Sequence, residues 1–175
     1  MNELKDYLIL DTETTGTGKY DEVIELGIID MAGNTVYHSL FKPSCPIQPK
    51  AEEIHGISLN DLDDAPKFSD EWHKIKTILA GKKILIYNAA FDLRLLSQTT
   101  RKYGFSEVLE KQATTCVMLS YAKYHGQINP QTGNYRWIKL ELALQNEGIS
   151  VMQTHRVIGD CLMTLALIKK IGKIW

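Results

Sequence analysis

The order of the apolar segments constrains the fold of this chain more than any other feature of its sequence. Strand-like segments come first, at residues 7–10, 23–30 and 35–41, and the turn residues between the last two predict a hairpin. Beyond residue 41 the pattern changes to helices that alternate with strands. A strand meander followed by this alternation predicts an α/β layered domain with a mixed sheet.

Capping and turn residues delimit the later elements. After a proline-rich loop we expect a short helical turn at 51–57, a capping box formed by Ser58 and Asp61, and a helix that Ser69 caps and Gly81 ends. The remaining predicted elements are a strand at 82–88, a helix at 89–104, a strand at 113–117, a helix near 118–124, a polar loop at 126–137, a helix near 139–147 and a last helix from about Thr154 towards Ile171.

Composition and charge exclude several classes of protein. The 175 residues, 44% of them hydrophobic, predict one globular domain covering residues 1–175. The 20 Lys and Arg residues nearly cancel the 21 Asp and Glu residues, so the overall charge indicates no nucleic-acid, membrane or acidic partner, although a local basic cleft stays open. Three widely spaced cysteines and a short N-terminal apolar run predict a reduced, cytoplasmic protein without a disulfide framework, zinc site, signal peptide or membrane span.

Two acids interrupt the first apolar strand. Asp11 and Glu13 follow residues 7–10, and strand alternation places both carboxylates on the same side as Tyr7 and Ile9. Taken alone, this pattern is also typical of a solvated strand end. The acids therefore need partners elsewhere in the chain before they indicate chemistry.

Two further acids lie on the apolar faces of predicted helices. Asp92 shares its face with Leu95 and Thr99, although an acid near a helix N-terminus is also favoured by about 0.3–1 kcal/mol without any other role. Asp160 falls within the apolar stripe of the last helix, where the alternative interpretation is a half-buried acid with satisfied hydrogen bonds. Both positions suggest carboxylates directed into the protein.

Convergence of these four acids would require cations. Two unit charges ~4 Å apart repel by about 1 kcal/mol in water and about 4 kcal/mol at an effective dielectric of 20. Hard divalent cations bind such oxygen ligands, and a metal pair clamps the attacking and leaving oxygens of a phosphoryl displacement. We therefore expect the acids to end the first strand inside a metal site. His155, five residues before Asp160, can face that site as a proton acceptor only at or before the first helical turn; the alternative is an exposed, inert histidine.

The order of the motifs "LDTETTG", "NAAFDLRLL" and "HRVIGD" resembles that of the DnaQ-like, or DEDDh, 3′–5′ exonuclease family. The segments "PIQPKAEEIHGIS" and "WIKLELALQNEGI" are also similar to the family's intervening regions, so the resemblance covers about residues 7–168. It implies a ribonuclease H-like fold, with a mixed five-stranded sheet flanked by helices.

The resemblance also implies residue roles. Asp11, Glu13 and Asp160 would bind the first of two divalent ions, Mg²⁺ or Mn²⁺, with Asp11 also reaching the second. Asp92 would hold the second ion through water, and His155 would be the general base that generates hydroxide. The residues matching positions that contact the terminal nucleotide are Thr12, Thr14, Ile54 and His55. From the residues alone, Ile54 is equally a core side chain and His55 a member of a capped turn.

The implied function is a 3′–5′ exonuclease that releases nucleoside 5′-monophosphates from single-stranded or frayed DNA. It would act in proofreading or repair, alone or with a polymerase or another replication or repair partner. The alternatives are an RNA-trimming member of the same family and a non-catalytic module that binds nucleic acid or protein. The complete acid set favours catalysis, because binding alone does not require mutually repelling carboxylates.

Three features depart from the family pattern or do not belong to it. Tyr87 stands where many members have histidine. The loop 126–137 has no clear family counterpart, and its Tyr135, Arg136 and Trp137 fit either base stacking or a packed tryptophan beside a surface arginine. Glu25, inside an apolar strand, is interpreted as a structural acid.

Overall fold

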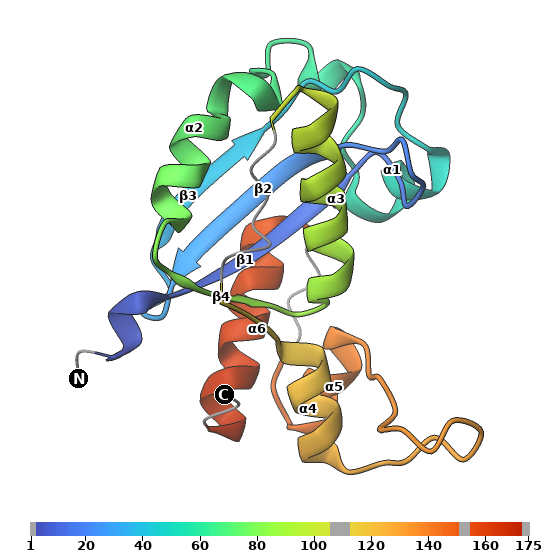
Figure 1. The fold of residues 1–175 in the computed structure, drawn as a ribbon. Helices are drawn as coiled ribbons and strands as arrows, with labels where there is room; N and C mark the ends of the chain where they lie inside the picture. Colours follow the sequence, from blue (N-terminus) through green and yellow to red (C-terminus); the bar gives the residue numbers. More distant parts are fainter. Residues whose placement is uncertain (1–2, 106–112, 151–154, 173–175) are drawn as a thin grey trace.

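A computed structural model describes residues 3–105, 113–150 and 155–172 of the chain, and Figure 1 shows their arrangement. The strands are β1 (Tyr7–Thr14), β2 (Val23–Asp30), β3 (Thr35–Leu40), β4 (Lys83–Ile86) and β5 (Thr114–Cys116). The helices are α1 (Pro49–His55), α2 (Phe68–Leu79), α3 (Ala89–Lys102), α4 (Val117–His125), α5 (Leu140–Asn146) and α6 (Val157–Ile171), with short 3₁₀ helices at Glu3–Asp6 and Asn60–Leu62.

The strands form one sheet in the order β3-β2-β1-β4-β5. Its first three strands pair antiparallel, as expected for a meander, and β4 and β5 add parallel to β1. Parallel neighbours need a crossover connection, which α2 and α3 supply. The predicted mixed five-stranded sheet flanked by helices is confirmed.

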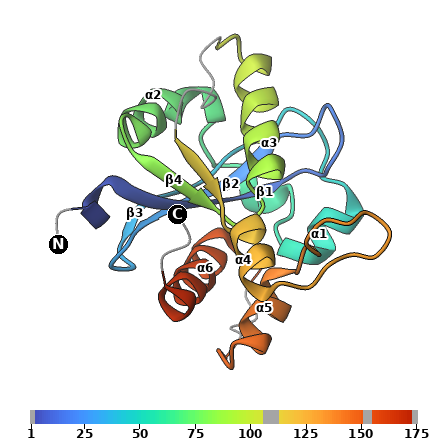
Figure 2. The ribbon, with the colours of Figure 1, turned by 60° about the horizontal axis from the view of Figure 1, so that its bottom comes forward.

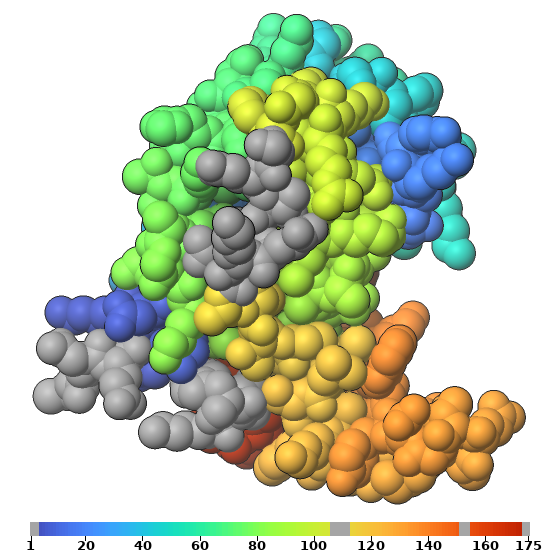
Figure 3. Space-filling view, in the orientation of Figure 1, coloured from blue at the N-terminus to red at the C-terminus, as the bar shows by residue number. Residues whose placement is uncertain are grey.

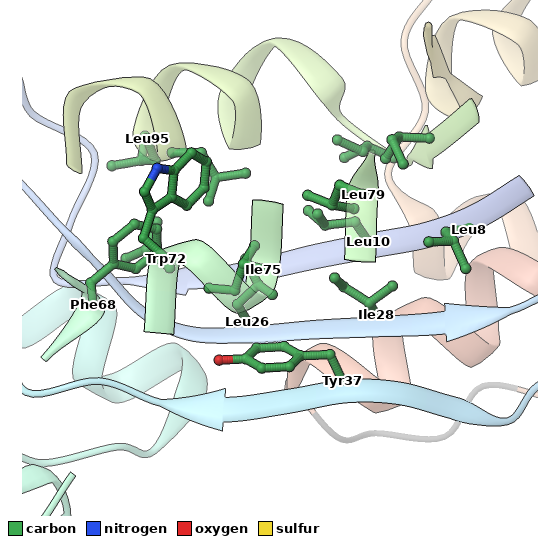
Figure 4. Packing of buried hydrophobic residues seen from close by; sticks show 14 of the residues in the cluster. Leu8, Leu10, Leu26, Ile28, Tyr37, Phe68, Trp72, Ile75, Leu79 and Leu95 are labelled. Atoms are coloured by element: carbon green, nitrogen blue, oxygen red, sulfur yellow. The ribbon is translucent and has the colours of Figure 1, made fainter. Parts of the chain in front are cut away.

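Strand alternation divides the core into two apolar layers (Figures 1 and 2). Leu8 and Leu10 point to the face covered by α2 and α3, where they join Trp72 and Leu95 (Figure 4). Tyr7 and Ile9 point to the opposite face and pack with residues of α4, α5 and α6. Side chains on β1 keep this alternation beyond Leu10. Asp11 and Glu13 therefore lie on the side of Tyr7 and Ile9, and Thr12 lies on the side of Leu8 and Leu10.

The C-terminal half of β1 lies beyond the end of β4. β4 pairs only with residues Tyr7 to Ile9, whereas β2 pairs with β1 as far as Thr14. One edge of β1 therefore has no strand beside it after Ile9 in the described residues. This open edge is where helices from both layers can approach the same segment of strand.

Several predicted boundaries were wrong. β1 does not end at the acids but continues to Thr14, because Asp11, Thr12 and Glu13 keep their pairing with β2. α2 begins at Phe68 rather than after Ser69, and the Asp70 carboxylate accepts a 3.3 Å hydrogen bond from the Lys67 N–H. Local sequence patterns located both elements but not their first and last residues.

Two other predicted helix starts also need correction. The Ser58 hydroxyl does not cap the following 3₁₀ helix; instead its N–H and hydroxyl both donate to the Asp61 carboxylate, at 2.8 and 2.7 Å. α6 starts at Val157 with Arg156 in the N-cap position. Thr154, the expected cap, lies outside the described residues.

Candidate active site

Three carboxylates converge where β1 faces α6. Asp11 and Glu13, two residues apart on β1, and Asp160, in the first turn of α6, each place an oxygen within 4.8 Å of the others. All three side chains are partly exposed. This is an oxygen-only donor set, which suits a hard divalent cation such as Mg²⁺ or Mn²⁺.

Asp92 approaches from the opposite helical layer. It lies in the first turn of α3, is 3% exposed, and accepts a 2.7 Å hydrogen bond from the Thr12 hydroxyl. Thr12 points away from Asp11 and Glu13 because neighbouring strand residues alternate sides. Asp92 therefore approaches the acid-bearing segment of β1 from the other face of the strand, and its charge acts on both Asp11 and Glu13.

The electrostatics of the cluster show how unfavourable four nearby charges are. Burial, followed by repulsion from the neighbouring acids, raises the pKa of Asp11 well above its ordinary value and that of Glu13 to about 8. Burial also raises the pKa of Asp92 to about 7, against the lowering effect of the Thr12 hydrogen bond. For Asp160, burial raises the pKa to about 6, although His155 opposes the shift. Bound cations would relieve this repulsion, so the residues present fit a metal site.

Glu25 lies directly opposite Glu13 in the β1–β2 register but is compensated. Burial acts to raise its pKa, but hydrogen bonds from Arg156 and His38 outweigh burial, and the pKa is lowered. Arg156 donates through Nε and Nη2 at 2.9 and 2.7 Å, and His38 Nε2 lies 2.7 Å away. The structure thus agrees with a structural role for Glu25, which ties the N-terminus of α6 to β2.

His155 immediately precedes this anchored N-terminus. It lies before the N-cap residue Arg156, as its predicted role requires, and its side chain is 51% exposed. Its Nδ1 lies 3.8 Å from a carboxylate oxygen of Glu141 on α5. A solvent-exposed imidazole next to the acid cluster's helix has the chemistry of a general base.

A pocket of about 290 Å³ adjoins the acid cluster. Its lining includes Glu13, Thr14, Ile54 and His55, so the structure brings three of the four expected nucleotide-contacting residues together. Thr12 is not in this lining and instead contacts Asp92. Ile54 is 51% exposed, which makes its interpretation as a core residue wrong.

His55 is buried and supports the pocket wall. Its Nδ1 accepts a 3.0 Å hydrogen bond from the Ile57 N–H, and its Nε2 lies 3.2 Å from the Thr14 carbonyl. Because Nδ1 is an acceptor, the proton resides on Nε2, which donates to Thr14. The capped-turn interpretation is therefore confirmed, and the imidazole fixes the backbone at Thr14.

Other residues of this pocket were not predicted from the sequence. Phe91, Lys50 and Gln48 also line it, from the first turn of α3 and the region of α1. Phe91 directly precedes Asp92 in the first turn of α3. Its position next to this acid is the only sequence feature that could have indicated that Phe91 lies near the site. The side chains of Gln48 and Lys50 follow a proline-rich loop whose path the sequence pattern does not predict.

Comparison with known proteins places the chain in a family. Residues 8–168 match the family described as exonuclease, RNase T. The chain belongs to this DnaQ-like exonuclease family. An uncharacterized exonuclease of Escherichia phage 186 is 36% identical over 173 residues, which is 96% of this chain and 89% of the phage protein. The DNA polymerase III subunit epsilon of Pasteurella multocida is 31% identical over 61% of this chain, but the match spans only 46% of that subunit.

Solved structures confirm the expected ribonuclease H-like fold. Exonuclease X in complex with 5′ overhanging duplex DNA has a TM-score of 0.69 at 24% identity, covering 94% of this chain and 90% of that one. A zinc-bound complex of E. coli exonuclease I with single-stranded DNA has a TM-score of 0.72 at 21% identity, covering 93% of this chain and 40% of that one. No helix in the described part of the chain combines the length and apolar character that crossing a bilayer requires.

Proposed function

We propose that residues 1–175 form a single metal-dependent 3′–5′ exonuclease domain that releases nucleoside 5′-monophosphates from single-stranded or frayed DNA. The observation that carries the proposal is the convergence of Asp11, Glu13 and Asp160 within 4.8 Å of one another, with Asp92 entering from the other face of β1. Such a cluster destabilises the fold unless cations bind it, so it is difficult to explain in a module that only binds.

Each residue has a defined part in this mechanism. Asp11, Glu13 and Asp160 would hold one divalent ion, and Asp11 and Asp92 would hold the second. When bound, the ions would act as Lewis acids that stabilise charge on the attacking and leaving oxygens. His155 accepts the proton of the attacking water, and its exposure allows that proton to reach solvent.

The adjoining pocket would hold the terminal nucleotide. Ile54 and Phe91 offer apolar surfaces against which a base packs, and Lys50 supplies positive charge. His55 keeps the Thr14 backbone in place beside them. A pocket of about 290 Å³ next to the acids is consistent with the binding of one nucleotide at a strand end.

Relatives favour DNA over RNA as the substrate. The names of the matching proteins include subunits of DNA polymerase III and an exonuclease X complex with overhanging DNA, which supports proofreading or repair and a polymerase or repair partner. RNA trimming is the second candidate, because the family that matches residues 8–168 is described as exonuclease, RNase T.

Digestion of matched DNA and RNA oligomers, single- and double-stranded, tests the proposal. Wild-type protein with Mg²⁺ or Mn²⁺ should shorten 5′-labelled single-stranded DNA stepwise and release 5′-mononucleotides, and a 3′-terminal phosphorothioate should slow it. Shortening from the 5′ end, or equal cleavage without divalent ions, contradicts the assignment. Faster digestion of RNA would select the second candidate.

Two substitutions test the residue roles. Asp11→Ala should abolish mononucleotide release, and His155→Ala should lower kcat by about 10²–10⁴-fold, the usual contribution of a general base. His73→Ala, at an exposed histidine on α2, is the matched control and should keep wild-type turnover. Wild-type turnover in either of the first two variants would show that the roles are assigned incorrectly.

A further inference from the structure

A second concave surface lies between α4 and the segment that follows it. We call it the α4–hairpin groove and define it by Leu119 and Lys123 on α4 and by Asn134, Tyr135, Arg136 and Trp137 on the following segment. The groove encloses about 690 Å³, more than twice the volume of the pocket beside Glu13. Figure 3 shows this segment, in orange, standing out from the molecule beside α4.

The segment is an ordered hairpin. Ile128 and Tyr135 form an antiparallel bridge, the Asn129 N–H donates to the Asn134 carbonyl at 2.8 Å, and the Arg136 N–H donates to the Gln127 carbonyl at 2.7 Å. Gly133, at a φ of +69°, allows the chain to turn at the tip. Hydrogen bonds across the hairpin therefore hold its backbone.

The groove combines aromatic surface with positive charge. Trp137 is 68% exposed and Tyr135 is 43% exposed, so the interpretation of a packed tryptophan is wrong. Lys123 and Arg136 form no ion pair or side-chain hydrogen bond with any residue the structure describes. The sequence from 117 to 139 contains Lys123, Arg136 and Lys139 but no Asp or Glu, in a chain that has 21 acids.

The hairpin that forms the groove is linked to two parts of the chain that carry candidate active-site residues. The Tyr87 hydroxyl donates a 2.7 Å hydrogen bond to the Ile138 carbonyl, at the base of the hairpin. Tyr87 lies five residues before Asp92, between β4 and α3. On the other side, α5 begins two residues after Ile138, and its Glu141 lies 3.8 Å from His155. Tyr87 thus anchors the base of the hairpin to the turn that leads into α3, the helix that carries Asp92.

We propose that the α4–hairpin groove binds the single-stranded stretch of substrate that precedes the terminal nucleotide. This inference rests on the proposed function and extends it from one nucleotide to several. Bases stack on Trp137 and Tyr135, and Lys123 and Arg136 lie against phosphates, which is how sequence-tolerant single-strand binding is commonly built. The positively charged side chains of Lys123 and Arg136 have no ion-pair partner among the residues that the structure describes, and residues 117–139 contain no acid. Such a surface complements a polyanion rather than an apolar protein surface.

Binding measurements in an Asp11→Asn background, which prevents digestion, test the groove directly. Trp137→Ala should weaken binding of a labelled dodecathymidylate about tenfold, as the loss of one base stack predicts, and should leave a dinucleotide unaffected. Arg136→Gln should reduce the slope of log affinity against log salt by about 0.7, as expected when one phosphate contact to a single strand is lost. Tyr124→Ala, an exposed aromatic of α4 outside the groove, and Lys74→Gln on α2 are matched controls and should change neither quantity.

The outcomes separate this inference from the proposed function. Turnover of the p-nitrophenyl ester of thymidine 5′-monophosphate needs the acid cluster, His155 and the pocket beside Glu13 but not the groove, so Trp137→Ala should keep it. If the wild-type protein turns over neither this ester nor any oligomer, the proposed exonuclease activity is wrong. The dodecathymidylate affinities would still show whether the groove binds single-stranded DNA. Equal affinities in wild type and Trp137→Ala overturn the inference. So does a Trp137→Ala variant that binds DNA normally but changes from dimer to monomer in sedimentation, because the groove would then be a contact between two copies of this chain.

Discussion

Replacing Glu13 with glutamine should stabilise the metal-free protein at pH 8, although it removes a proposed metal ligand. Burial and repulsion from Asp160, Glu25 and Asp92 raise the Glu13 pKa from 4.5 to about 8. The folded protein therefore holds the proton more tightly than the unfolded chain does. It follows that stability falls as pH rises from about 4.5 to about 8 and changes little from this group above that range.

The pKa of Glu13 sets the size of the effect. At about 1.4 kcal/mol per tenfold change in proton affinity, the shift from 4.5 to about 8 corresponds to a ceiling of about 5 kcal/mol at pH 8. Asp11 and Asp160 can hold protons themselves and so share part of the repulsion, and the partly buried amide needs its own hydrogen bonds. We therefore expect Glu13→Gln to raise the free energy of unfolding by about 1–3 kcal/mol at pH 8 and by less than about 1 kcal/mol at pH 5.

Urea denaturation at pH 5 and pH 8, first with chelator and then with Mg²⁺ or Mn²⁺, measures the difference in free energy of unfolding between the wild type and Glu13→Gln. At a hundredfold excess of metal over its dissociation constant the wild-type protein should gain about 2.7 kcal/mol, and Glu13→Gln should gain much less. Burial lowers the pKa of His55, and this makes the free energy of unfolding rise with pH, opposite to the effect of Glu13. Both proteins contain His55, so its effect cancels in the difference between them. Glu53→Gln, at an exposed glutamate of α1, is the control. A Glu13→Gln protein that is less stable than wild type without metal at pH 8, or that gains as much from metal, would refute the reasoning.

Two other predictions concern the contacts that support the site. Arg156→Ala should lower the free energy of unfolding by about 2–3 kcal/mol, since Glu25 is 1% exposed while Arg156 is 46% exposed; a double-mutant cycle by urea denaturation should show that Glu25→Gln removes most of this cost. Tyr87→Phe should cost about 1–2 kcal/mol through the unsatisfied Ile138 carbonyl and should weaken dodecathymidylate binding, and unchanged affinity would argue against Tyr87 as the anchor of the hairpin.

The sequence predicted the sheet and the acids because both follow from periodicity. Leu8 and Leu10 alternate with Tyr7 and Ile9 between the two apolar layers, as the strand pattern requires. The helical spacing that placed Asp92 with Leu95 on the inner face is also found, since both are buried. Patterns that repeat along one element survive folding, because burial of the apolar face decides the orientation of the whole element.

Features that depend on two elements were harder to predict. The strand was expected to end at Asp11, but its length is set by pairing with β2, which no local pattern in residues 7–16 reveals. Likewise, the exposure of Trp137 depends on the absence of a covering element among the described residues, and the sequence of the loop fits a packed or an open tryptophan equally well. Phe91 on α3 and Lys50 on α1 line the same pocket, and no local sequence pattern reveals that these two elements share it.

The early end of β4 is what joins these features into a site. Had β4 continued along β1 beyond Ile9, its backbone would occupy the edge across which Asp92 reaches Thr12, and acids on opposite faces of the sheet would be separated by a strand. Instead the chain leaves the sheet at Ile86 and turns at Tyr87 and Asn88 into α3, which carries Phe91 and Asp92 to the open edge. The same turn directs the Tyr87 hydroxyl to the base of the hairpin at Ile138. The position at which β4 ends therefore places Asp92, one wall of the proposed nucleotide pocket and the proposed path of the incoming strand, so a change that lengthens β4 should impair all of them together.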